Sequence, residues 1–272
     1  MSTFDLSTRA KFALTGEDRI RFLNGQVTND VKKATTEKAI PACVTNAKGK
    51  LDALIHITVA PDGEAFWIDA HASLRETLFT RLDRYIIADD CELTDITDDY
   101  QLWHAIGEEN SEHDKTLSVE SNRLGLNGHD AWSKSPPPWE ATDPIEADRL
   151  RIDHLIPEWA AEASGDTFPA DLGLDEIAVD FHKGCYIGQE FVSRIKLSGK
   201  NNRTLGSATF ESPPSPGMTL YADEKEVGIV TTAVENTALA VLRRSKASVG
   251  LKVVARDPEK PLSIPGEITK TV

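Results

Sequence analysis

The hydrophobic and polar positions in the first part of the chain alternate between strand-like runs and helix-like spacing. Short apolar runs bounded by turn residues predict strands, and the turns NAKGK and PDGE separate three of them. Apolar residues at helical spacing predict a short helix over residues 16–26 and a longer one over residues 73–88, which Ser73 can cap. The predicted strands are residues 11–14, 39–45, 51–59, 64–70, 91–96 and 101–106.

The second part of the chain begins with a polar stretch and ends with closely spaced strands. Residues 107–141 are rich in turn residues, which predicts a surface excursion with two short strands. A helix is predicted over residues 143–154, because Asp143 can cap it and a proline suits its first turn. Another helix is predicted to begin near Gly188. From residue 203 onward short strands predict a small all-β module, so we place the domain boundary there.

The composition is typical of a soluble globular protein, with 40% hydrophobic and 27% charged residues among 272. No apolar run approaches the ~20 residues that cross a bilayer, and the N-terminal segment lacks the apolar core of a signal peptide. The formal net charge of −14 opposes binding to a phosphate backbone. We therefore expect a cytoplasmic protein without a membrane contact and without a direct nucleic-acid partner.

Three cysteines stand far apart in the chain, and neither a Cys-x-x-Cys pair nor a Cys/His cluster accompanies them. That spacing predicts no metal site and reduced thiols. Cys43 and Cys91 lie in apolar, strand-like segments, where a cysteine behaves as a small buried hydrophobe. Cys185 lies between two glycines and has a different neighbourhood.

The segment DFHKGCYIGQEFVSRIKLSGKNNR, residues 180–203, gathers positive charge around Cys185. A nearby ammonium group and a following helix start favour the reactive thiolate, and the flanking glycines would let a ligand approach the backbone. This pattern predicts a site for an anionic small molecule, while a structural cysteine beside a solvated basic helix face remains the alternative. Five cations stand against Glu190 over residues 183–203: Lys183, Arg194, Lys196, Lys200 and Arg203.

The octapeptide KGCYIGQE resembles the signature of the folate-binding YgfZ-type family of iron–sulfur cluster assembly factors, which are relatives of the glycine cleavage T-protein, an aminomethyltransferase. Further segments resemble the family: LTGEDRIRFLNGQVTNDV, NAKGKLDALIHI, LRIDHLIPEWAAE, FPADLGL, and EVGIVTTAV with ALAVLRR. The resemblance covers most of the chain. It implies an α+β fold of the T-protein type, a three-part ring with a ferredoxin-like portion, in which residues 1–202 form two interleaved subdomains and residues 203–272 form a small β-barrel.

The resemblance also implies a folate contact at Glu162. In T-proteins an acidic residue eleven positions after the arginine of this region contacts the folate pterin, and counting from Arg151 gives Glu162, with Pro169 at the family's spacing. A carboxylate fork matches the paired donors of an aminopyrimidine edge. The segment departs from the family at Leu155, where a glycine is usual.

The T-protein's catalytic carboxylate lies in a G-G-x-x-D-D strand, and the matching place here is KGKLDAL. Asp52 is the one acid retained, and Ala53 follows it, so the resemblance puts aminomethyl transfer in doubt. The cysteine of KGCYIGQE belongs to the YgfZ type and is absent from T-proteins, which points the same way.

We therefore expect a monomeric protein that binds tetrahydrofolate, or a one-carbon-substituted folate, and supports iron–sulfur cluster assembly or repair for client proteins such as tRNA-modifying radical enzymes. The alternatives are a folate-dependent aminomethyl transferase, a non-catalytic folate sensor or scaffold, and a cysteine hydrolase with His182 or His154 as base. The residues expected to carry chemistry are Cys185, Lys183 and Asp52, and those expected to hold folate are Glu162, Asp52, Gln189, Arg194 and Arg203.

Overall fold

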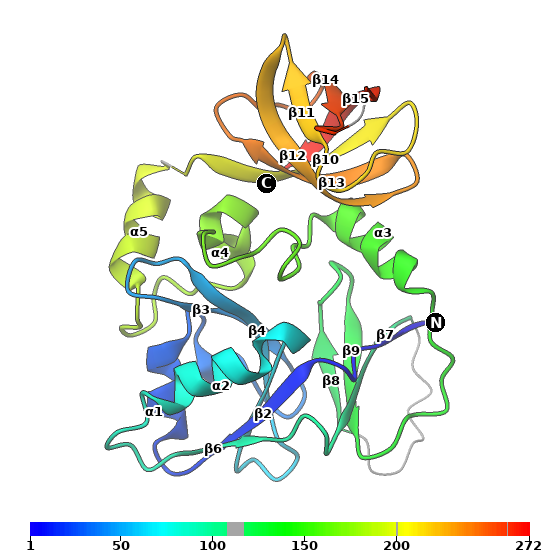
Figure 1. Ribbon diagram of the computed structural model, residues 1–272. Helices are drawn as coiled ribbons and strands as arrows, with labels where there is room; N and C mark the ends of the chain where they lie inside the picture. The colour runs from blue at the N-terminus through cyan, green and yellow to red at the C-terminus, as the bar shows by residue number, and fades with distance from the viewer. Residues whose placement is uncertain (108–116, 200, 260) are drawn as a thin grey trace. The chain divides into compact units, whose positions relative to one another are not determined.

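The computed structural model describes residues 1–107, 117–199, 201–259 and 261–272 (Figure 1). The chain divides into two compact units. Unit 1 contains Met1–Asp143 and Ile177–Phe191, and unit 2 contains Pro144–Glu176 and Val192–Val272. The expected domain division at residue 203 stays a prediction. Lys200 of the cationic segment and residues 108–116 of the polar excursion lie outside the described residues.

Unit 1 contains a five-stranded sheet of order β3-β4-β5-β2-β6. All its pairings are antiparallel, and the alternation along β4 buries every second side chain. All six strands predicted for this part of the chain are present, five of them here and one, β7, in a second sheet. The strands of the five-stranded sheet are β2 (Ala10–Thr15), β3 (Ile40–Thr45), β4 (Leu51–Val59), β5 (Phe66–Ala70) and β6 (Glu92–Asp95).

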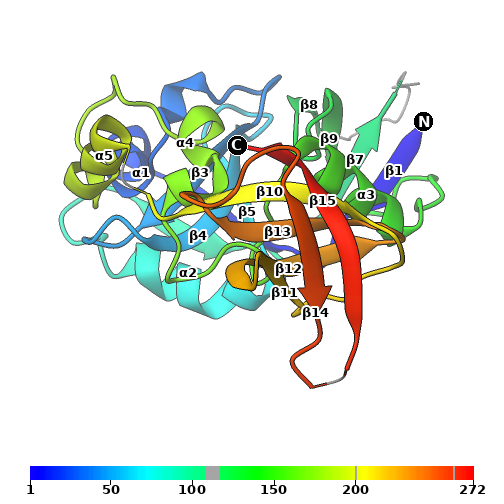
Figure 2. The same cartoon turned by 90° about the horizontal axis from the view of Figure 1, so that it is seen from above.

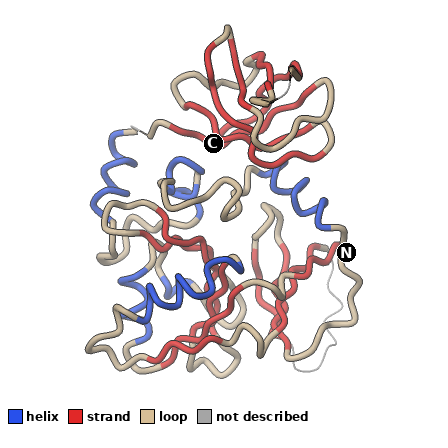
Figure 3. The backbone as a smooth tube through the Cα atoms, in the orientation of Figure 1, coloured by secondary structure: helices blue, strands red, loops and turns tan. Residues whose placement is uncertain are grey.

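Two α-helices and two 3-10 helices accompany this sheet, and Figure 3 shows α2 running beside its strands. Helix α2 packs on β2 and β6; Leu78 and Leu82 are its buried residues, and the ring centre of Phe79 lies 5.9 Å from that of Phe12 on β2. It ends earlier than predicted, because the amides of Tyr85 and Ile86 bond the carbonyls three residues back and close a turn. The cap is also not Ser73: a 3-10 turn capped by His71 precedes the helix. The elements are α1 (Arg19–Gln26), η1 (Val31–Lys33), η2 (Ala72–Leu74) and α2 (Arg75–Asp83).

The second sheet of unit 1 has the order β1-β7-β9-β8. The polar excursion does supply two strands, as predicted, but they are not superficial, since Asp130 and Trp132 of β9 are buried. Strand β1 was missed because only four residues pair, with β7. The strands are β1 (Ser2–Asp5), β7 (Gln101–Ile106), β8 (Leu117–Ser121) and β9 (Gly128–Ser133).

A buried charge network connects the two sheets of unit 1. Arg123 donates to both carboxylate oxygens of Asp69 on β5, at 2.9 and 2.5 Å, and to both oxygens of Asp130 on β9, at 2.7 and 2.8 Å. Burial raises the pKa of Asp69 by itself, but the charges of Arg123 and Arg9 outweigh it and lower that pKa to about 2. Burial lowers the pKa of His56 to about 3, so this ring is neutral where it meets Arg123.

Unit 2 contains the predicted all-β module, a closed barrel of order β10-β13-β12-β11-β14-β15. In Figure 2 strands β14 and β15 run side by side, in agreement with their pairing. Strand β15 was missed because Pro265 and Gly266 resemble a turn; a Cβ at Gly266 would collide with the ring of Phe210. The strands are β10 (Arg203–Phe210), β11 (Thr219–Ala222), β12 (Lys225–Val234), β13 (Thr237–Arg243), β14 (Lys252–Arg256) and β15 (Ser263–Thr271).

Of the remaining helices, Pro144–His154 and Gln189–Ser198 were predicted, and the two short ones between them, Pro169–Leu172 and Leu174–Ile177, were missed. Helix α3 packs on β12 of the barrel, and a 3-10 helix, η3, packs on β10. Among the described residues, no helix has both the length and the hydropathy to cross a bilayer. The helices are α3 (Pro144–His154), η3 (Pro169–Leu172), α4 (Leu174–Ile177) and α5 (Gln189–Ser198).

Candidate functional site

The octapeptide KGCYIGQE forms a turn that leads into α5, and the helix begins beside Gly188 as predicted. Cys185 is exposed on this turn, whereas Cys43 is buried in β3. Cys91 differs from its prediction, because it precedes β6 and is partly exposed. Burial, followed by the neighbouring carboxylates, raises the pKa of the Cys91 thiol to about 11. Of the three cysteines, Cys185 is therefore the most exposed.

Lys183 anchors this turn to the end of α1. Its ammonium donates to the backbone carbonyls of Asn24, Val27 and Asn29 at 2.6, 2.8 and 2.8 Å. These carbonyls lie at and just after the C-terminus of α1, where carbonyl groups lack helical partners and favour a cation. Burial lowers the pKa of Lys183 to about 8, above neutral pH, so the group keeps its three protons there. The contacts of Lys183 are thus those of an anchor for the loop.

The two glycines around Cys185 have different surroundings. Gly188 has φ +87°, and a Cβ there would collide with the carbonyl oxygen of Asn46 and lie 2.8 Å from Oγ1 of Thr45. The preceding carbonyl, of Ile187, accepts a 2.5 Å hydrogen bond from that same hydroxyl. A Cβ added at Gly184 would have no atom within 4 Å apart from those of its neighbours in the chain. Gly188 therefore seats the loop on the β3–β4 hairpin, while Gly184 leaves space beside the thiol.

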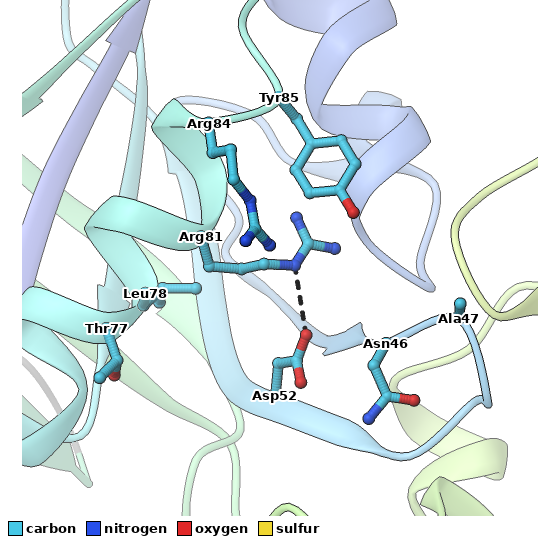
Figure 4. Close-up of a pocket in the computed structure, with 8 residues that line it drawn as sticks. All are labelled: Asn46, Ala47, Asp52, Thr77, Leu78, Arg81, Arg84 and Tyr85. Atoms are coloured by element: carbon cyan, nitrogen blue, oxygen red, sulfur yellow. Dashed lines mark hydrogen bonds and ion pairs between the residues drawn. The ribbon is translucent and has the colours of Figure 1, made fainter.

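Asp52 lines a pocket of about 360 Å³ at the C-terminal end of α2 (Figure 4). Its Oδ2 accepts from Nε of Arg81 at 3.2 Å. Arg81 also donates to the side chain of Gln26 and to the backbone carbonyl of Thr45, so the same guanidinium contacts α1, β3 and β4. The lining residues are Asn46, Ala47, Asp52, Thr77, Leu78, Arg81, Arg84 and Tyr85.

Two arginines and a tyrosine in this pocket were missed from the sequence. The guanidinium carbons of Arg81 and Arg84 lie 4.3 and 5.4 Å from the centre of the Tyr85 ring. The two arginines stand one helical turn apart in RLDRY, within the helix predicted over residues 73–88. This spacing indicated that the two arginines lie on one side of the helix. The position of the Tyr85 ring depends on the turn that ends α2 and could not be predicted.

Glu162 is buried in unit 2 and bound by protein groups. Its Oε2 accepts from Arg151 and from the backbone amide of Glu158, and its Oε1 accepts from the hydroxyl of Thr232 on β12 at 2.7 Å. Arg151, in α3, is buried as well. Leu155 directly follows α3, and its φ of +56° is the left-handed conformation that favours glycine. The departure from the family at this position therefore places a leucine in a glycine conformation.

The other predicted residues differ in their surroundings. Lys196 pairs with Asp175, at 2.9 Å, and with Glu176. Arg194 is exposed on α5, and Arg203 is exposed at the start of β10. Gln189, the first residue of α5, lies in unit 1 with Asp52, Lys183 and Cys185, whereas Glu162, Arg194 and Arg203 lie in unit 2. Within the described ranges, no group of three or more histidine, cysteine, aspartate or glutamate side chains is arranged to hold a metal ion.

Comparisons with known proteins agree with the resemblance found in the sequence. Residues 203–271 match the family model described as the C-terminal β-barrel domain of CAF17. Proteins named "tRNA-modifying protein YgfZ" are similar over 97% of this chain and 88% of their own length: those of Escherichia coli O7:K1 and Escherichia fergusonii are each 28% identical over 298 residues, and that of Shigella boydii serotype 4 is 29% identical over 301.

The fold has a close structural counterpart. The crystal structure of the glycine cleavage system aminomethyltransferase T from Bartonella henselae superposes with a TM-score of 0.82, covering 99% of this chain and 85% of that one, at 16% identity. That identity establishes the fold and not the activity. The predicted α+β fold of the T-protein type with a C-terminal β-barrel is confirmed. The resemblance to the YgfZ-type family is also confirmed. This chain is similar to the YgfZ proteins over nearly its whole length and carries a CAF17-type C-terminal barrel.

Proposed function

We propose that this protein supports tRNA modification as a folate-binding factor that maintains iron–sulfur enzymes. The observation that carries the proposal is the similarity to YgfZ proteins over 97% of the chain, which includes the octapeptide around Cys185. The loop geometry supports it, because an exposed thiol is held on a turn that Lys183 and Gly188 fix in place. A thiol so presented is accessible to a bound small molecule and to a client protein.

Folate binding is proposed at Glu162. A carboxylate has about four lone-pair sites, and three are used by Arg151, Glu158 and Thr232. Those three bonds fix the orientation of the carboxylate, and because its side chain is fully buried, a pterin would have to displace the groups that cover it to reach the fourth site. Arg194 and Arg203, exposed in the same unit, are the proposed partners of the folate carboxylates. The proposed ligand is tetrahydrofolate or a one-carbon-substituted form of it.

Aminomethyl transfer is the less favoured function. The one candidate for the catalytic carboxylate, Asp52, is paired with Arg81, and buried Ala53 follows it. An aspartate in an ion pair is a weaker acceptor for a folate amine than an unpaired carboxylate. Gln189 and Asp52 remain predicted folate contacts from the sequence.

The experiment is a complementation assay in bacterial cells that lack their own YgfZ. Mass spectrometry of tRNA nucleosides measures the product of an iron–sulfur-dependent tRNA-modifying enzyme. The natural sequence and the Arg244→Gln variant are expected to restore the modification, because Arg244 is an exposed residue of the barrel outside the octapeptide. Cys185→Ala is expected to fail at equal protein abundance. Failure of the natural sequence, or full activity of Cys185→Ala, would contradict the proposal.

A further inference from the structure

The turn that carries Cys185 is held to the β3–β4 hairpin by a buried hydroxyl group. Oγ1 of Thr45, the last residue of β3, donates to the backbone carbonyl of Ile187 at 2.5 Å. Thr45 is fully buried, so its hydroxyl is shielded from water, which strengthens the hydrogen bond. At the other end of the turn, Lys183 is bound by the carbonyls at the end of α1. The three residues between Lys183 and Ile187 therefore span two fixed points.

A bulge in the hairpin lies at Thr45. The register of β3 and β4 shifts between Val44 and Thr45, which makes Asp52 an extra residue in β4. Such a bulge bends a strand and redirects the side chains around it. The backbone carbonyl of Thr45 also accepts a hydrogen bond from Arg81 at 3.3 Å, and Arg81 pairs with Asp52. Thr45 thus connects the Asp52–Arg81 pair to the cysteine turn.

The bond from Thr45 fixes the main chain two residues after Cys185. Without it the Ile187 carbonyl would be free to move, while Lys183 would still hold the start of the turn and the thiol would stay exposed. A small reagent can approach an exposed thiol from many directions, so it does not need a fixed main chain. A reaction partner that must meet the thiol in one orientation does need it, because a displacement of about 1 Å can lower a rate by about a hundredfold.

We propose that Thr45 is a positioning residue for Cys185, and that its hydroxyl holds the thiol in the orientation that the reaction partner of Cys185 requires. The inference rests on the proposed function, in which Cys185 acts in tRNA modification, and it adds to that function a residue that lies outside the octapeptide.

The test compares three variants in the complementation assay and in amide hydrogen exchange. Thr45→Val removes the hydroxyl and keeps the branched shape of the side chain, whereas Thr45→Ser keeps the hydroxyl. Thr58→Val is the matched control. Thr58 is also a buried residue of the five-stranded sheet, and its hydroxyl also donates to a backbone carbonyl, that of Thr35 at 3.0 Å.

At equal protein abundance, Thr45→Val is expected to lower the tRNA modification at least about tenfold, a change of about 1.4 kcal/mol. Thr45→Ser and Thr58→Val are expected to stay within about threefold of the natural sequence. The amides of residues 184–188 are expected to exchange at least about tenfold faster in Thr45→Val, because the turn opens more often, and at an unchanged rate in Thr58→Val. Alkylation of Cys185 by iodoacetamide is expected to change less than about threefold in Thr45→Val, since the thiol stays exposed.

The proposal is overturned if Thr45→Val restores the modification as well as the natural sequence does, or if Thr45→Ser fails to restore it. An equal loss in Thr58→Val would also overturn it, since any lost buried hydroxyl would then act alike. Equal exchange of residues 184–188 in the natural protein and in Thr45→Val would overturn it as well. Hydrogen exchange does not require tRNA modification. Failure of the natural sequence to complement would therefore contradict the proposed function, while exchange would still decide whether Thr45 holds the turn.

Discussion

At the scale of single residues, the octapeptide separates into groups that fix the loop and one group that faces solvent. The cation nearest to Cys185 in sequence was expected to favour the thiolate. In the structure, the three donors of Lys183 are bound by carbonyl groups at the end of α1. The exposure of Cys185 is thus the property that distinguishes it from Cys43 and Cys91.

We expect Cys185 to react with iodoacetamide at least about tenfold faster than Cys91 near pH 7.5. A thiol pKa near 11 leaves less than a thousandth of Cys91 as the reactive thiolate at that pH. Cys43 is expected to be slower still, because it is buried. Mass spectrometry of peptides over a time course gives the three rates. Equal rates for Cys185 and Cys91 would show that neither exposure nor the carboxylates around Cys91 control the reaction.

At the scale of elements, the β3–β4 hairpin, α1 and the cysteine loop support one another. The amide of Ile187 bonds the carbonyl of Gly25 in α1 at 3.2 Å, and its carbonyl accepts from Thr45 in β3. Gly188 then passes too close to the hairpin for any side chain.

Gly188→Ala is therefore expected to lower the free energy of unfolding by about 3 kcal/mol, from a positive φ combined with a steric collision. Gly184→Ala is the matched control, with an expected change within about 0.5 kcal/mol. Urea unfolding measures both. Equal midpoints for the two variants would refute the close approach of loop and hairpin.

Most helices and strands could be predicted from the sequence because their hydrophobic residues recur with a clear helical or strand period. The prediction was wrong where contacts between distant segments determine the local structure. The alternation in β4 and the leucines of α2 could be assigned directly. The Pro265–Gly266 pair resembled a turn, and its glycine is needed to accommodate a ring on the neighbouring strand. In the candidate site, KGCYIGQE was identified from local sequence alone. The pairing of Arg81 with Asp52 could not be, because β4 and α2 meet only through the fold.

The buried charge network between the two sheets of unit 1 makes the stability of the protein depend on pH. The pKa of Asp69 is lowered to about 2 in the folded protein, so its stabilisation is present above the unfolded value near 4 and is lost as the pH falls toward 2. The pKa of His56, lowered to about 3, acts in the same direction below pH 6.5, because the unfolded chain binds that proton first. Stability is therefore expected to fall steadily from pH 6.5 downward.

Arg123→Leu removes the cation shared by two buried carboxylates, and we expect a loss of about 3–5 kcal/mol at pH 7. The loss of stability between pH 5 and pH 3 is expected to be smaller in this variant, because the pKa of Asp69 is depressed less when Arg9 remains its partner without Arg123. Arg256→Leu, which breaks an exposed pair with Glu224, is the control and is expected to cost less than about 1 kcal/mol. Urea unfolding, followed by tryptophan fluorescence at several pH values, measures the free energy of unfolding of both variants. An equal loss of stability in the two variants would contradict the role of the network.

At the scale of the whole molecule, a shared fold does not carry a shared reaction. The T-protein fold is present over nearly the entire chain, and Asp52, the acid that the sequence resemblance offers for the catalytic position, lies in an ion pair with Arg81. We expect aminomethyl transfer with a lipoyl carrier protein and tetrahydrofolate to be at least about a hundredfold slower than with an authentic T-protein, as for loss of a catalytic group. Ammonia release in a coupled assay measures it, and comparable turnover would refute the expectation.

The measurement that bears most directly on the proposed function is calorimetric titration of tetrahydrofolate into the whole protein under reducing conditions. The account predicts saturable binding to one site, weakened at least about tenfold by Glu162→Gln, because a lost charge-assisted hydrogen bond exceeds the ~1.4 kcal/mol that tenfold requires. Circular dichroism must show that the variant is folded, since Arg151 loses its buried partner. Absence of tetrahydrofolate binding by the natural sequence, or equal affinity in a folded Glu162→Gln variant, would contradict the account.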